Sequence, residues 1–197
     1  MKKFQKALFK GSFNPLQAGH LYLLDTARDI CEKTDIYVGN KKRPNLLPRS
    51  IRAKAINKNI KSNNWQEHFN IISTKKHYDL IPEKYDLFIT GSDLLNIITK
   101  KISCRGIEIP QKYKDFYLRF PNILILDRIG QPLEKDAKKK LEYYTNVTYG
   151  KCPIKISGSE IRQAYQAGKD ISKLISGPTW KIVKNYAHFF KETKRHN

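Results

Sequence analysis

The first thirty residues combine a short apolar run, a glycine-containing turn and a helical repeat, and this combination constrains the fold most. The run Ala7-Leu8-Phe9 ends near a glycine, which is typical of a buried strand. Residues 11–20, which read Gly-Ser-Phe-Asn-Pro-Leu-Gln-Ala-Gly-His, form the turn. Apolar side chains then recur at helical spacing, at Leu21, Leu24, Ala27, Ile30 and Cys31. Strand, glycine turn and helix predict the first half of a βαβ unit.

Further short apolar runs predict more strands, at 36–38, 69–72, 87–90 and 123–126, with an edge strand at 147–149. Ser50 would cap a helix that lies between the first two of these runs. Because strands alternate with helical segments, the sequence predicts an α/β fold with a Rossmann-like, doubly wound parallel sheet. Ligands of such sheets bind beyond the carboxyl ends of the strands.

The C-terminal third is predicted to be helical. Ser157 or Ser159 would cap a helix from Glu160 to about Ala167, and a last helix follows Pro178. One face of this last helix carries Ile182, Val183, Tyr186 and Phe190. We expect residues 1–197 to form a single domain, with the C-terminal helices from about 157 packed on the sheet.

Basic residues dominate the composition. The chain has 38 Lys and Arg against 18 Asp and Glu, which gives a formal net charge of +20 and would attract anions. The lysines are spread along the chain and no Arg-rich tract stands out, which argues against nucleic acid as a dedicated partner.

No targeting or metal-binding pattern is apparent in the sequence. We expect no membrane partner, because no apolar segment is long enough to span a bilayer, and the N-terminus lacks the features of a secretory signal. The three cysteines, Cys31, Cys104 and Cys152, are too widely spaced for a zinc site. These features predict a cytoplasmic protein without a metal site of its own. They are compatible with a homo-oligomer as well as with a monomer.

The turn at 11–20 has the features of a phosphate-binding loop. Glycine lets the backbone approach a phosphate closely, and the N-terminus of the following helix presents free N–H groups to an anion. Gly-Ser-Phe-Asn-Pro followed by Gly-His resembles the first motif of the nucleotidyltransferase superfamily, most of all the nicotinamide- or nicotinate-mononucleotide adenylyltransferases. The segment Ile156–Arg162, Ile-Ser-Gly-Ser-Glu-Ile-Arg, is similar to their second motif. Weaker similarity lies at 88–93 and 125–130, and the resemblance covers about residues 4–190.

The resemblance implies roles for residues of both motifs. His20 would donate to the reacting phosphates, and Arg162 would bind the triphosphate. Gln17 stands where the family has His or Thr; its amide donates a hydrogen bond but carries no charge. The remaining predicted substrate-binding residues are Gly11, Ser12, Phe13, Asn14, Lys41, Lys42, Gly91, Asp93, Arg128, Ser157 and Ser159.

The activity implied is transfer of AMP from ATP to nicotinamide or nicotinate mononucleotide. The products are pyrophosphate and NAD or deamido-NAD, and Mg²⁺ would arrive bound to ATP. One alternative is adenylyl or cytidylyl transfer to another phosphorylated acceptor such as phosphopantetheine, although residues 149–153 lack the element usual in the cytidylyl branch. A second alternative is a non-catalytic descendant that binds nucleotides or nucleic acid, which the Gln17 departure and the charge motivate.

Overall fold

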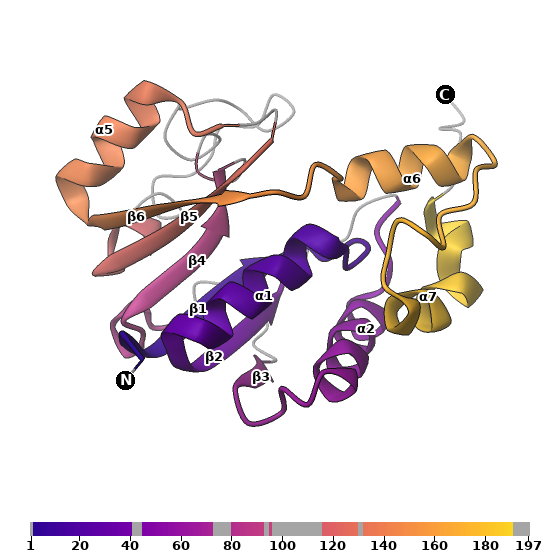
Figure 1. Cartoon of the computed structure of the whole chain (residues 1–197), viewed down its shortest axis with the longest axis horizontal. Helices are drawn as coiled ribbons and strands as arrows, with labels where there is room; N and C mark the ends of the chain where they lie inside the picture. The colour runs from indigo at the N-terminus through magenta and orange to yellow at the C-terminus, as the bar shows by residue number, and fades with distance from the viewer. Residues whose placement is uncertain are drawn as a thin grey trace.

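A six-stranded sheet, parallel throughout, runs through the molecule (Figure 1). The computed structural model describes residues 2–40, 45–72, 80–92, 95, 116–129 and 132–190, without the side chains of Arg128, Asp136 and Lys140. The strands are β1 (Phe4–Gly11), β2 (Cys31–Val38), β3 (Phe69–Ile72), β4 (Leu87–Gly91), β5 (Asn122–Arg128) and β6 (Asn146–Cys152). The α-helices are α1 (Ala18–Ile30), α2 (Arg49–Ser62), α5 (Lys135–Tyr144), α6 (Gly158–Gln166) and α7 (Gly177–Val183), and 3-10 turns lie at η2 (Pro82–Lys84) and η3 (Lys184–Phe190).

The strand order β3-β2-β1-β4-β5-β6 confirms the predicted Rossmann-like topology. The chain moves outward from β1 to β3, then returns to the other side of β1 and moves outward again to β6. The direction of winding therefore switches between β1 and β4, where ligands of such sheets bind.

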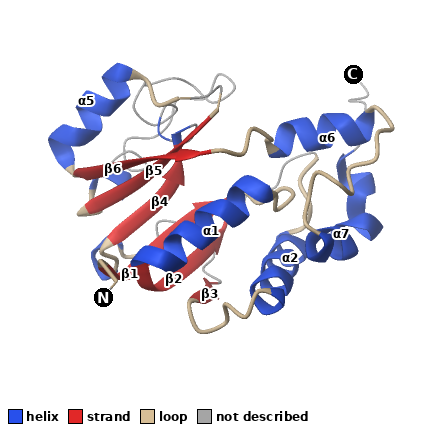
Figure 2. Cartoon of the chain, in the orientation of Figure 1, coloured by secondary structure: helices blue, strands red, loops and turns tan. Residues whose placement is uncertain are grey.

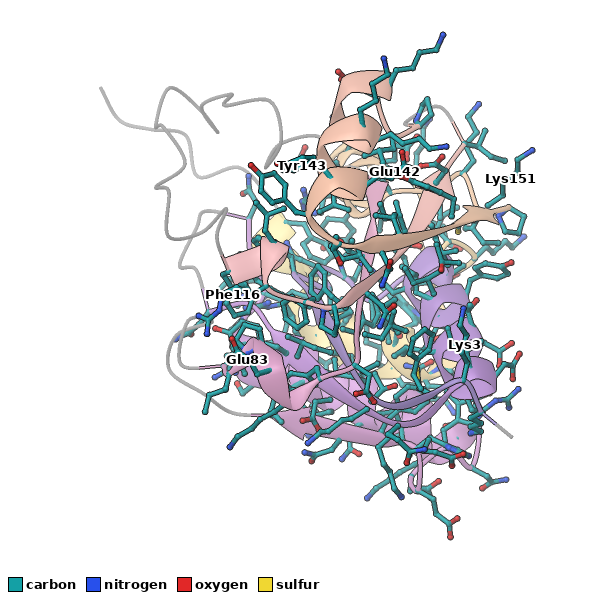
Figure 3. All side chains as sticks on the ribbon, turned by 90° about the vertical axis from the view of Figure 1, so that its left-hand side faces the viewer. Lys3, Glu83, Phe116, Glu142, Tyr143 and Lys151 are labelled. Carbon is teal, nitrogen blue, oxygen red and sulfur yellow. The ribbon has the colours of Figure 1, made fainter. Side chains whose placement is uncertain are left out.

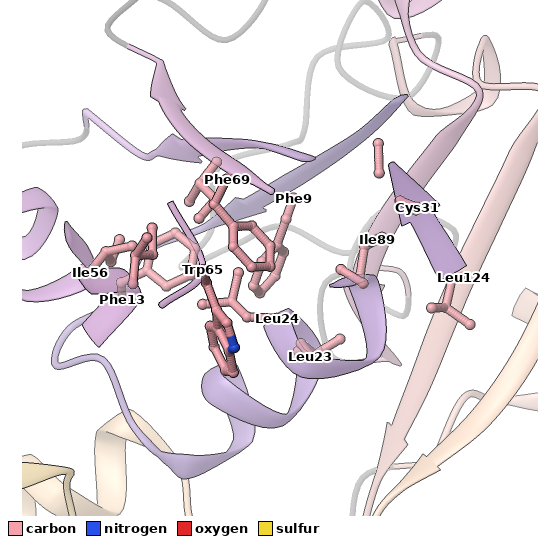
Figure 4. Packing of buried hydrophobic residues seen from close by; sticks show 14 of the residues in the cluster. Phe9, Phe13, Leu23, Leu24, Cys31, Ile56, Trp65, Phe69, Ile89 and Leu124 are labelled. Atoms are coloured by element: carbon pink, nitrogen blue, oxygen red, sulfur yellow. The ribbon is translucent and has the colours of Figure 1, made fainter. Parts of the chain in front are cut away.

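Helices cover the sheet on both faces (Figure 2). On one face, side chains of α1 and α2 pack on the central strands, and Figure 4 shows Leu23, Leu24 and Ile56 beside Phe9 and other strand residues. The opposite face is covered by α5 and by an aromatic cluster that contains Phe116, Tyr117 and Phe120. Because both faces are covered, the central strands are apolar on both sides.

The edge strand β6 differs from the central strands. Asn146, Thr148 and Lys151 are exposed on it, and Figure 3 shows Lys151 and Tyr143 of the neighbouring α5 on the outer side of the molecule. A lysine on an edge strand opposes pairing with another chain.

The C-terminal helices form a third apolar cluster, which packs on α2. This cluster joins Leu47 to Ile161, Val183, Ala187 and Phe190. The expected docking on the sheet is thus indirect, through α2. Tyr186, predicted on the apolar face, is exposed, and Ala187 is buried with Val183 and Phe190.

The structure settles the caps predicted for two of the helices. α2 begins at Arg49 with Pro48 as its N-cap residue, so the prediction of a Ser50 cap is wrong. α6 is capped by Ser157, one of the two caps predicted for this helix. None of the helices in the described part of the chain has both the length and the apolar character needed to cross a membrane.

Candidate active site

The carboxyl ends of β1, β2 and β4 meet at one edge of the sheet. Gly11 pairs with Val38, and the Gly39 N–H donates to the Gly11 carbonyl at 2.9 Å. Phe9 pairs with Ile89, which puts Gly91 level with Gly11 two residues further on. Two of the predicted site glycines therefore lie on neighbouring strands.

The first loop folds around the ring of Phe13. This ring is buried edge-on against Phe9, with centroids 5.2 Å apart, and lies 5.0 Å from the His20 ring. A Cβ on Gly11 would come within 2.8 Å of the Phe13 ring. Gly11 is thus required by the packing of the loop itself, and Ser12 is left exposed at the edge of the sheet.

Gln17 and His20 form a capping box at the start of α1. The Gln17 side-chain oxygen accepts from the Gly19 N–H, and the Gln17 backbone N–H donates to His20 Nδ1 at 3.3 Å. A neutral His20 that accepts at Nδ1 carries its proton on Nε2, so it is set up as a donor there. The structure therefore places both residues of the first motif at the positive end of α1.

The second motif closes over the first loop. Arg162 donates through Nη1 to the Asn14 carbonyl at 2.6 Å and through Nη2 to the Ser159 hydroxyl at 3.0 Å. Ser157 caps α6 in a second capping box, with Glu160. A Cβ on Gly158 would lie 2.8 Å from the Asn14 carbonyl oxygen, so this approach requires glycine. The N-termini of α1 and α6 thus meet at the first loop.

Asn14 links the first loop to the segment that follows β2. Its side-chain Nδ2 donates to the Asn45 carbonyl at 2.7 Å, and its Oδ1 accepts from the Leu47 N–H at 2.9 Å. Asn14 was predicted to bind substrate, but in this structure its amide holds two loops together.

Arg52, on α2, is a component of the site that the motifs do not include. It is 2% exposed, and its guanidinium donates to three carbonyls: Leu47 at 2.8 Å, Ser12 at 2.6 Å and Gly39 at 2.8 Å. The sequence holds one signal of this role. Arg52 occupies a helix face that is otherwise apolar or uncharged, and a charge on such a face needs buried partners.

The site carries positive charge on partly or fully buried groups. Burial lowers the pKa of Arg162, and burial together with the nearby charge of Arg49 lowers the pKa of Arg52 to about 10. Both arginines stay protonated at neutral pH, and within the described residues neither forms a salt bridge with a carboxylate. Two cations that lack a protein counter-ion favour an anionic ligand.

The structure does not describe the side chains of four predicted site residues. Lys41, Lys42 and Asp93 lie outside the described residues. Arg128 ends β5 at the same edge of the sheet, paired with Cys152, but its side chain is not described. The site therefore comprises the first loop, the start of α1, the start of α6 and Arg52. Such a set of donors and cations is suited to phosphoryl-group chemistry, in which alignment and charge neutralisation dominate.

Comparison with known proteins gives relatives that match most of the chain. A probable nicotinate-nucleotide adenylyltransferase of Clostridium kluyveri is 25% identical over 205 residues, covering 91% of this chain and 96% of the relative. A phosphopantetheine adenylyltransferase of Borreliella burgdorferi is also 25% identical, but over 124 residues, 63% of this chain and 66% of the relative.

Solved structures show the same fold. The nicotinic acid mononucleotide adenylyltransferase of Plasmodium falciparum, in complex with NaAD, superimposes with a TM-score of 0.68 at 19% identity, covering 96% of this chain and 98% of the other. The Rossmann-like fold predicted from the sequence is thereby confirmed.

The family model for cytidylyltransferase-like proteins matches residues 8–164, a stretch that includes the first loop and Arg162. The two motifs predicted membership of the nucleotidyltransferase superfamily, and this match confirms it: the chain belongs to the cytidylyltransferase-like family.

Proposed function

We propose that this protein is an adenylyltransferase that joins AMP from ATP to nicotinate mononucleotide. The observation that carries the proposal is the contact of the two motifs, in which Arg162 binds the Asn14 carbonyl at 2.6 Å and so brings α6 against the phosphate-binding loop. A relative that matches over 91% of the chain is named for nicotinate mononucleotide, which favours nicotinate over nicotinamide. The cytoplasmic location inferred from the sequence is part of this proposal.

The reaction needs no covalent intermediate with the protein. A phosphate oxygen of the mononucleotide attacks the α-phosphorus of ATP, the bond from that phosphorus to the bridging oxygen breaks, and pyrophosphate leaves with the electron pair. Negative charge rises on the departing oxygens, where preorganised donors stabilise it. We assign this stabilisation to His20 Nε2, at the positive end of α1, and to Arg162.

Magnesium would enter as part of the substrate. Mg²⁺ prefers phosphate and water oxygens to a cage made only of protein groups. The charged and ring donors next to the loop are His20, Arg52 and Arg162, which suit phosphate oxygens rather than a bare cation. Deamido-NAD is the expected product.

Pyrophosphate release tests the proposal directly. Purified protein is incubated with MgATP or MgCTP and with nicotinate mononucleotide, nicotinamide mononucleotide or phosphopantetheine. We expect turnover with MgATP and nicotinate mononucleotide, and a fall of about 100-fold or more in kcat for His20→Ala, because removing one transition-state donor costs that much.

His68→Ala is the matched control, since His68 lies just before β3 at the amino edge of the sheet and contacts Lys2. It should retain kcat. Turnover with phosphopantetheine alone would favour the second candidate function, which the Borreliella relative supports. Absence of pyrophosphate with every pair would overturn the enzyme proposal.

A further inference from the structure

Arg52 is a buried cation whose partners in the described structure are all neutral. Its three hydrogen bonds end on backbone carbonyls, and burial of a guanidinium without a counter-ion is costly. Methionine or leucine would fill a position on the buried face of α2 without this cost. Ser12 belongs to the first loop of the candidate site, so the guanidinium connects that loop to the chain at the end of β2 and at the start of α2.

The three acceptors come from separate stretches of chain. Ser12 lies in the first loop, Gly39 directly follows β2, and Leu47 precedes α2. A guanidinium is a planar fork with donors in fixed directions, so binding all three fixes their relative positions. A lysine ammonium on a flexible stem does not reproduce this geometry.

The bond to Ser12 also fixes the direction of the next N–H group. In a trans peptide the N–H points opposite to the C=O, so a Ser12 carbonyl turned towards Arg52 directs the Phe13 N–H away from it. Within the described part of the chain no hydrogen bond to the Phe13 N–H is found. Phe13 is 0% exposed, and an unpaired buried backbone donor is costly unless a ligand satisfies it, as an anionic oxygen would.

We propose that Arg52 is a positioning residue of the transfer site: it sets the Ser12–Phe13 peptide so that the Phe13 N–H faces the anionic substrates. The inference rests on the proposed function and adds to it a residue outside both motifs. Arg52 contacts no reacting atom. It acts by fixing the first loop through the Ser12 carbonyl and by placing a positive charge next to that loop.

Arg49 provides a matched control one turn earlier on α2. Its guanidinium also donates to backbone carbonyls, those of Val38 at 2.9 Å and Ile72 at 3.2 Å, and it lies over the Tyr37 ring. These contacts join the ends of β2 and β3 and do not reach the first loop. Arg52→Lys and Arg49→Lys therefore make the same chemical change in the same helix.

The test measures kcat, KM and amide hydrogen exchange in both variants. For Arg52→Lys we expect kcat to fall about 100-fold, the loss that a small misplacement of a catalytic element produces. Exchange in segment 11–17 should become faster. Arg49→Lys should lower stability to a similar extent without a comparable loss of kcat and without faster exchange in that segment.

Equal kcat values and equal exchange in the two variants would overturn the positioning role. A wild-type protein that releases no pyrophosphate would instead contradict the proposed function. In that case the exchange data still decide whether Arg52 holds the loop, because they do not depend on turnover.

Discussion

At the residue scale, Gln17 has an unusual environment for a polar side chain. It is 0% exposed, its oxygen accepts from the Gly19 N–H, and its Nε2 is buried without a hydrogen-bond partner in the described structure. An unsatisfied buried donor costs stability and is retained where a ligand satisfies it. We interpret Gln17 as a cap whose amide N–H groups serve a phosphate oxygen.

Gln17→Glu separates the cap from the donor. The carboxylate keeps an acceptor for the Gly19 N–H but replaces Nε2 by a negatively charged oxygen, so kcat/KM should fall by about 10- to 100-fold. Gln17→Ala also removes the cap and should lower the free energy of unfolding by about 1 kcal/mol. Urea unfolding and steady-state kinetics measure the two effects. Full activity in Gln17→Glu would show that the amide does not contact the substrates.

The sequence predicts the motif residues better than it predicts their partners. Gly11, His20, Ser157 and Arg162 stand in two short contiguous patterns that are legible without a structure. Arg52 could be recognised only as a charge on a buried helix face. Its acceptors lie up to 40 residues away, and hydrogen bonds to a backbone carbonyl leave no trace in residue type.

At the scale of elements, a buried polar network joins α2 to α7. Asn59 donates to the Thr179 hydroxyl at 2.9 Å and accepts from the Ser176 hydroxyl at 2.6 Å, while Ser176 caps α7. Asn59 and Thr179 are both buried. Such a network fixes how two elements sit against each other, since a shifted helix would leave its groups unsatisfied.

Asn59→Ala is expected to lower the free energy of unfolding by about 1–3 kcal/mol, because it leaves buried hydroxyls without partners. The control is Ser62→Ala in the same helix, whose hydroxyl bonds the Lys58 carbonyl at an exposed position. That change should stay within about 0.5 kcal/mol of wild type. Chemical denaturation of both variants tests the comparison, and similar losses would contradict a role for the network.

The strands were predictable because buried parallel strands are short apolar runs between turn residues. The packing partner of the last helix was not predictable from the sequence. An apolar face on a helix shows that it is covered, but the choice between sheet and α2 depends on how Leu47, Ile161 and Val183 come together in space.

At the scale of the whole molecule, the net charge of +20 affects the rate at which anionic substrates reach the site. Lysines such as Lys3 and Lys151 are exposed on the side of the molecule shown in Figure 3. Positive potential of this extent accelerates the approach of ATP, and salt screens it.

Raising the ionic strength from about 20 mM to about 200 mM should therefore lower kcat/KM several-fold while kcat changes little. The measurement is steady-state kinetics in potassium chloride, with sucrose of equal osmolality as the control. A parallel fall of kcat at constant KM would indicate that salt acts on the folded site rather than on substrate approach.

The hydrogen bond from Arg162 to Asn14 joins residues 148 positions apart in the chain. During translation the first loop leaves the ribosome long before the helix that closes over it, and contacts of such long separation form late in folding. A nascent chain can complete β1 and α1 early, yet its two capped helix ends meet only after residue 162 has emerged. Under the proposed function, binding of one nucleotide by both motifs is therefore expected only after Arg162 has emerged and α6 has packed on the first loop.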